Sequence, residues 1–120
     1  MDSDFQVELA PDVRQLAALR RSLAQWLATA EVESSAREAV ILAAHEAAAN
    51  AVEHAHAPVV VSGSRGRDSV TVVVTNTGPW KESEGSEFRG RGLPIMRGLM
   101  SHVDIGSDDA GSVVTMRLTL

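Results

Sequence analysis

An alanine-rich segment in the middle of the chain constrains the fold more than any other feature. Ten alanines lie within residues 36–57. Ser35 followed by Glu38 fits a capping box, which predicts that a helix begins at Ser35. This helix would run to about Ala55, before Pro58 stops it. Because alanine side chains are small, a strand, another helix or a ligand can approach the helix closely, and the other elements must be arranged around it.

Other hydrophobic patterns predict the elements around this helix. Phe5, Val7 and Leu9 alternate with polar residues, as in a strand with one buried face. From Pro11 to Ala30, apolar residues recur at spacings of three and four, which is typical of an amphipathic helix. In chain order, the sequence predicts a strand at 5–9, helices at 11–30 and 35–55, strands at 59–62 and 70–75, a helix at 93–102, and strands at 103–105 and 113–120. This order predicts an α+β fold, a two-layer α/β sandwich in which a mixed, mostly antiparallel sheet carries helices on one face.

Length, charge and composition narrow the class of protein. A chain of 120 residues is enough for one domain that spans residues 1–120. The net charge of -5 argues against nucleic acid or an anionic membrane surface as a partner, since both require a clustered positive field. No apolar run approaches the roughly 18 residues of a membrane span, and the absence of cysteine gives no sign of an oxidising compartment. We therefore expect a cytoplasmic protein whose partners are proteins or small molecules.

Polar residues interrupt the alanine-rich helix at a regular interval. Glu46, Asn50 and His54 are four residues apart, so they form one stripe about 12 Å long on one face of the helix. Carboxylate and amide oxygens are hard ligands that suit Mg²⁺, which commonly takes one or two protein oxygens and completes its shell with water and phosphate. A solvated helix face explains the same spacing. The stripe by itself therefore leaves both interpretations open.

Two glycines precede the helix that is predicted to begin at Leu93. Gly90 and Gly92 would let the backbone approach a phosphate, and the helix N-terminus would offer unpaired N–H groups. A plain junction between a loop and a helix has the same pattern. The chain lacks the Walker P-loop, and no strand runs directly into these glycines as the Rossmann fingerprint requires. A phosphate site at this junction is therefore only one of two interpretations.

Four segments together resemble the motifs of one ATPase superfamily, which comprises gyrase, heat-shock chaperones, histidine kinases and MutL. The run at residues 46–55 resembles the N-box, in the form that anti-sigma-factor serine kinases carry. Residues 76–80 resemble the first glycine box, and residues 90–96 resemble the second, which has the form Gly-x-Gly-Leu. Residues 111–114 are similar to the last motif, which is usually Gly-Thr. With the N-terminal strand and helix, the resemblance covers nearly the whole chain.

The resemblance implies that the domain binds ATP and Mg²⁺. Asn50 would coordinate the Mg²⁺ ion, and Glu46 would be the general base that orients or deprotonates the attacking hydroxyl. Gly78 would let the backbone pass close to the adenine, and Ser112 would place a hydroxyl near it. The phosphate-side residues implied by the second glycine box are Arg89, Gly90, Arg91, Gly92 and Leu93.

One position departs from the family pattern. The first glycine box normally begins with an aspartate, whose carboxylate accepts a hydrogen bond from the adenine amino group. Here that position is Asn76. An amide oxygen can accept the same bond, but it is uncharged, so adenine binding would weaken by roughly 1–2 kcal/mol.

The resemblance also implies a regulatory function. In that family a serine kinase phosphorylates an anti-anti-sigma partner, the same domain can hold a sigma factor inactive, and a homodimer is common. Two alternatives remain. One is a non-catalytic protein-interaction module of the same fold that has weakened nucleotide binding through Asn76. The other is an ATPase-like domain of a larger signalling protein. Zinc binding by His54 and His56 is not expected, because residues two apart on a helix do not share a face.

Overall fold

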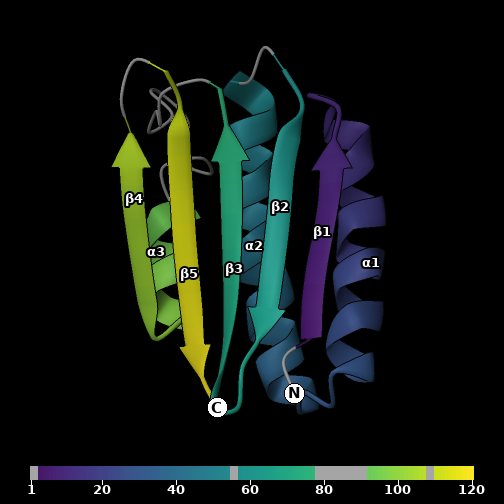
Figure 1. Cartoon of the computed structure of the whole chain (residues 1–120). Helices are drawn as coiled ribbons and strands as arrows, with labels where there is room; N and C mark the ends of the chain where they lie inside the picture. Colours follow the sequence, from purple (N-terminus) through teal and green to yellow (C-terminus); the bar gives the residue numbers. More distant parts are fainter. Residues whose placement is uncertain (1–2, 55–56, 78–91, 108–109) are drawn as a thin grey trace.

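The computed structural model, which describes residues 3–54, 57–77, 92–107 and 110–120, has its helices and strands in two layers (Figure 1). The helices all cover the same face of the sheet (Figure 1). In chain order the elements are β1 (Ser3–Leu9), a short 3-10 helix η1 (Val13–Gln15), α1 (Leu16–Thr29), α2 (Ser34–His54), β2 (Val59–Arg65), β3 (Ser69–Asn76), α3 (Gly92–Leu99), β4 (His102–Ser107) and β5 (Ser112–Thr119).

The sheet has five strands in the order β1-β2-β3-β5-β4. Each pair of neighbouring strands in it is antiparallel. Strand β5 lies between β3 and β4, and its register with β3 sets Val114 opposite Val74 and Ser112 opposite Asn76. The predicted α+β sandwich with helices on one face is therefore confirmed.

The alanine-rich helix α2 lies at the centre of the helical layer. It packs against α1, α3 and β3, and its buried residues are Val40, Ala43, Ala44, Ala47, Ala48, Ala51 and Val52. On the sheet, alternate residues of β3 face this helix, and Val70, Val72 and Val74 are fully or almost fully buried. The small side chains thus admit a strand and two helices as close neighbours, as the composition allowed.

Three helix ends differ from the sequence prediction. The helix expected from Pro11 begins as the 3-10 helix η1, and α1 itself begins only at Leu16. Asp12 caps η1, because its side chain accepts a hydrogen bond from the Arg14 N–H. The predicted capping box is wrong, because α2 begins at Ser34 and the Ser35 hydroxyl donates to the carboxylate of Glu33 at 2.7 Å. Helix α3 ends at Leu99, three residues early, because β4 begins at residue 102.

Helix α1 ends in a Schellman-type cap. The N–H of Val32 donates to the carbonyl of Leu27 at 3.0 Å, and the N–H of Glu31 donates to the carbonyl of Ala28 at 3.1 Å. Glu31 has a φ of 60°, in the left-handed region that favours glycine at this position. A glutamate therefore stands where the cap geometry disfavours any residue with a Cβ.

Among the helices that the structure describes, none combines the length and the apolar character that a membrane crossing requires.

Candidate functional site

The polar stripe of α2 lies in the C-terminal half of that helix, and the start of α3 lies against it. Glu46, Asn50 and His54 are all half-buried. Gly92, the first residue of α3, is so close to Glu46 that a Cβ at position 92 would lie 3.6 Å from the Glu46 Oε2 atom. Leu93 is half-buried and packs against the core. The structure thus brings the Glu46 carboxylate and Gly92, a residue of the predicted second glycine box, together.

A second group of predicted residues meets at the ends of β3 and β5. The side chain of Asn76 is buried, and its Nδ2 donates to the carbonyl of Ala51 on α2 at 3.5 Å. The hydroxyl of Ser112, also buried, donates to Asn76 Oδ1. A Cβ at Gly111 would collide with the backbone carbonyl oxygen of Asn76, so this position requires glycine. Strands β3 and β5 and helix α2 are therefore joined by polar contacts at this end of the sheet.

A cavity of about 540 Å³ opens at the same end of the sheet. Asn76, Thr77, Gly111 and Ser112 are among the residues that line it. The first glycine box and the last motif therefore border a space large enough for part of a small molecule.

One atom of the polar stripe lacks a hydrogen bond. The Nε2 atom of His54 is buried without a partner among the described side chains. A buried polar atom of this kind is uncommon in native proteins, because leaving it unbonded costs about 1–3 kcal/mol. His54 is therefore an exception that needs a physical reason.

His45, the residue before Glu46, makes a contact that the sequence did not indicate. Nη1 of Arg20, on α1, is 3.0 Å from Nδ1 of His45, on α2. Because a guanidinium only donates, Nδ1 of the neutral ring accepts this bond and the ring proton lies on Nε2. Burial, followed by the charge of Arg20, lowers the pKa of His45, whereas the Glu46 carboxylate acts in the opposite direction. This contact fixes α1 against α2 next to the proposed base, and no spacing in the sequence could have indicated it.

Four predicted site residues lie outside the described part of the chain. They are Gly78, Arg89, Gly90 and Arg91, and the same holds for His56. Within the described ranges, no group of three or more histidine, cysteine, aspartate or glutamate side chains could hold a metal ion.

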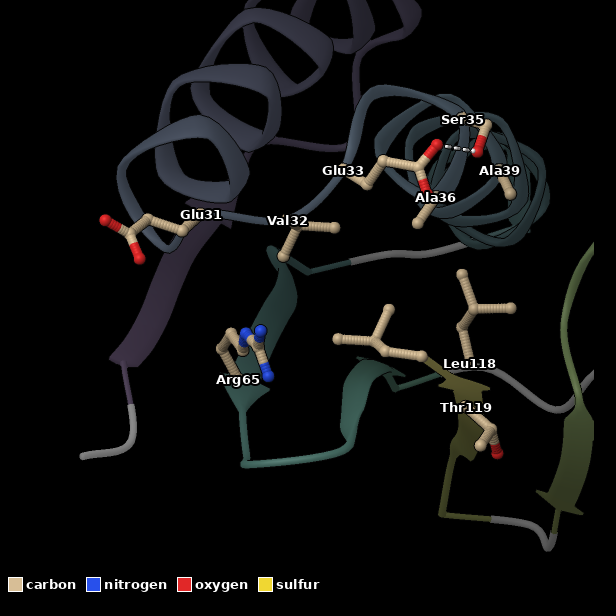
Figure 2. A pocket seen from close by; sticks show the side chains of 10 residues that line it. Glu31, Val32, Glu33, Ser35, Ala36, Ala39, Arg65, Leu118 and Thr119 are labelled. Carbon is tan, nitrogen blue, oxygen red and sulfur yellow. Dashed lines mark hydrogen bonds between the residues drawn. The ribbon is translucent and has the colours of Figure 1, made fainter.

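A different cavity, of about 450 Å³, lies at the other end of α2 (Figure 2). Its lining includes Val32, Ala36 and Leu118, which are apolar, and the charged side chains of Glu33 and Arg65. Arg65 donates to backbone carbonyl oxygens of Ala30, Gly66 and Arg67. The Glu33 carboxylate accepts the bond from Ser35 (Figure 2). The guanidinium and this carboxylate are therefore already bonded within the protein.

Comparison with known proteins agrees with the fold. The family model described as a histidine kinase-like ATPase domain matches residues 9–118, a range that contains all four motifs. Among solved structures, the crystal structure of the RsbU and RsbW domains of Rv1364c from Mycobacterium tuberculosis is similar, with a TM-score of 0.77 and 22% sequence identity. The match covers 96% of this chain but 32% of that one, so this chain spans about a third of the solved chain. A search of curated proteins gives no match.

Proposed function

The chain belongs to the histidine kinase-like ATPase domain family, and from this membership we propose that it binds ATP with Mg²⁺ and transfers the terminal phosphoryl group to a serine of a partner protein. The observation that carries the proposal is the proximity of Glu46 and Gly92, with Asn50 one turn further along the same face of α2. A carboxylate, an amide and a glycine-led helix start are the groups that phosphoryl transfer needs in one place.

The residues at this end of α2 fit a magnesium nucleotide. Asn50 offers an amide oxygen, and Mg²⁺ commonly takes only one or two protein oxygens and completes its shell with water and phosphate, so the Glu46 carboxylate stays available for the proton. Gly92 has no side chain, which leaves room beside the Glu46 carboxylate. We propose Asn50 as the metal ligand, and we assign Gly92 and Leu93 to the phosphates. Of the residues outside the described ranges, Arg89, Gly90 and Arg91 would join the phosphate side and Gly78 the adenine side.

The adenine side of the proposed site contains Asn76 and Ser112. Both side chains are buried, and they are bonded to each other. The Asn76 amide is held between Ser112 and the Ala51 carbonyl, so its position is set before any ligand arrives. A preorganised polar group of this kind suits recognition of a base edge, because little ordering is needed on binding.

The proposed mechanism gives one task to each group of the chain. Bound ATP and Mg²⁺ would supply the phosphoryl group and neutralise its charge. The Glu46 carboxylate would accept the proton of the attacking serine hydroxyl. The backbone at Gly92 would leave space for that hydroxyl to reach the carboxylate. The contact between Arg20 and His45 would hold the helix that carries Glu46 in position.

We propose an anti-anti-sigma protein as the phosphorylated partner and a sigma factor as a second partner, with both acting in the cytoplasm. This part of the proposal is supported by the N-box form in residues 46–55 and by the similarity to a structure that contains an RsbW domain. A second candidate function, a protein-interaction module without nucleotide, is favoured by one observation. The polar groups of Asn76 are already bonded to Ala51 and Ser112, which reduces what they can offer to adenine.

Two measurements separate these functions. Calorimetric titration of the chain with ATP and Mg²⁺ should give saturable binding, and no binding at millimolar nucleotide would favour the interaction module. Incubation with labelled ATP and a candidate anti-anti-sigma protein should place the label on a serine of the partner. Label that appears only as free phosphate would contradict the kinase proposal and support an ATPase-like domain.

A further inference from the structure

The amide of Asn76 has hydrogen-bonding groups that a carboxylate at the same position would lack. We infer that these groups let the proposed base subsite bind a 6-oxopurine nucleoside triphosphate, such as ITP, about as tightly as ATP. The inference rests on the proposed function, because it requires that the base of a nucleotide lies against Asn76. It extends the substrate class of that site to purine nucleotides with either an amino group or a carbonyl at C6.

The orientation of the Asn76 amide follows from its two partners. The Ala51 carbonyl can only accept a hydrogen bond, so it faces the Nδ2 atom, which donates to it at 3.5 Å. Oδ1 then faces Ser112 and accepts a hydrogen bond from its hydroxyl. An amide turned end for end would set Oδ1 against the Ala51 carbonyl, and two acceptors repel each other. The positions of the amide oxygen and nitrogen are therefore fixed.

These two bonds use only part of the amide. Nδ2 has two hydrogens and Oδ1 has two lone pairs, and the bonds to Ala51 and Ser112 take one of each. Within the part of the chain that the structure describes, the other hydrogen and the other lone pair have no partner. The Asn76 side chain is only 6% exposed and lines the cavity of about 540 Å³. A ligand in this cavity therefore meets a donor and an acceptor on one side chain.

The edge of a purine at C6 matches such a donor and acceptor in either of two forms. Adenine has an amino group that donates at C6 and a ring nitrogen, N1, that accepts. A 6-oxopurine has the reverse, a carbonyl that accepts at C6 and an N1–H that donates. An amide can satisfy both forms, because it donates and accepts side by side. The aspartate of the family pattern only accepts, so it suits the amino group and sets a negative charge against a carbonyl.

A subsite that does not contact the base would also bind ATP and ITP equally. The two explanations differ for purine riboside triphosphate, in which a hydrogen replaces the group at C6. If Asn76 bonds to the group at C6, this nucleotide lacks one hydrogen bond and should bind about tenfold more weakly than ATP. If no protein group touches C6, it should bind as ATP does.

The test measures by calorimetry, with Mg²⁺, the affinity of the parent and of Asn76→Asp for ATP, ITP and purine riboside triphosphate. We expect the parent to bind ATP and ITP within about threefold of each other, and purine riboside triphosphate about tenfold more weakly than either. Asn76→Asp should bind ATP about tenfold more tightly than the parent and ITP about tenfold more weakly. Thr71→Ser, on β3 but outside the lining of the cavity, is the control and should keep the affinities of the parent.

The outcomes are distinct. A parent that binds ATP but binds ITP about tenfold more weakly would overturn the inference. Equal binding of all three nucleotides would overturn it too, because Asn76 would then not contact C6. Both results leave the proposed function intact, whereas a parent that binds none of the nucleotides would overturn that function as well. Should Asn76→Asp fail to fold, the three affinities of the parent still decide, because they require no substitution.

Discussion

Two cavities of comparable size lie at opposite ends of the molecule: one of about 450 Å³ at the N-terminus of α2, and one of about 540 Å³ that is lined by the ends of β3, β4 and β5. The two regions differ in how far their polar side chains are hydrogen-bonded within the protein. At the N-terminal end, Arg65 and Glu33 are bonded to other groups of the protein. At the C-terminal half of α2, Asn76 and Ser112 are bonded to each other, but the Nε2 atom of His54 is buried without a partner in the described part of the chain, and the Asn76 amide reaches the Ala51 carbonyl only at 3.5 Å.

This difference shows why cavity volume is a poor guide to function in this molecule. A ligand gains affinity from polar groups that the protein leaves unsatisfied, and it gains little from groups that must first break internal bonds. At the N-terminal cavity, the Arg65 guanidinium and the Glu33 carboxylate already have partners within the protein. The C-terminal end has polar groups aligned on one helix face, and we expect chemistry there.

The most severe test of this comparison replaces one glutamate at each end of α2, Glu46 and Glu33, by glutamine in separate variants. Glu46→Gln should lower the rate of phosphoryl transfer by roughly 10²- to 10⁴-fold, because an amide cannot accept the hydroxyl proton. Its ATP affinity should stay near that of the parent. Glu33→Gln, at the N-terminal end of α2, is the matched control and should leave both quantities unchanged. Equal losses in the two variants, measured with labelled ATP, would remove the distinction between the ends.

A change at the adenine side sharpens the comparison. In Asn76→Asp, a charged acceptor would replace the amide oxygen, and ATP should bind about tenfold more tightly by calorimetry. The variant should also melt at a lower temperature, because a carboxylate has no hydrogen to donate to the Ala51 carbonyl and is buried beside it. An unchanged affinity would mean that Asn76 does not touch the base.

At the opposite end, the cap of α1 offers a change that should affect stability alone. Glu31→Gly removes the Cβ from a residue with φ of 60°, which should stabilise the fold by roughly 1 kcal/mol. Thermal denaturation would show a rise of a few degrees. Glu31 lines the N-terminal cavity and not the cavity at the strand ends, so ATP affinity should stay the same. A change in affinity would argue that this cavity takes part in nucleotide binding.

The smallest expected effect concerns pH. The pKa of His45 is lowered by folding, so just below about pH 6.5 the unfolded chain binds more protons than the folded protein. The contribution of the neutral His45 ring to stability is therefore complete above about pH 6.5. It is lost as the pH falls from there through the lowered pKa of the folded protein. The melting temperature of His45→Gln should decline less than that of the parent between pH 7.5 and 5.5. Parallel curves would show that His45 does not titrate in this way.

The sequence predicted the fold well, because its signals are local. Alternation in β1 and helical spacing in α1 specify each element from neighbouring residues, and their order specifies the layers. The start of α2 was placed one residue late, because Ser35 lies inside the first turn and its hydroxyl donates to Glu33, two residues before it. A capping pattern does not show which of two neighbouring residues begins the helix.

The candidate site could be predicted only in part from the sequence. The stripe that begins at Glu46 follows from spacing on one helix, but its neighbourhood depends on contacts between distant segments. The bond from Ser112 to Asn76 requires the register of β3 with β5, and the contact of Arg20 with His45 requires the packing of α1 on α2. Neither the register nor the packing is encoded in a local pattern.

The most direct test of the account is a map of amide chemical shifts, recorded by NMR as ATP and Mg²⁺ are added to the ¹⁵N-labelled chain. If the nucleotide binds at the C-terminal half of α2, the amides of Asn50, Ala51 and Asn76 should shift with a common saturation curve, while those of Val32 and Ala36 should not shift. Shifts confined to Val32, Ala36 and their neighbours around the N-terminal cavity would contradict it.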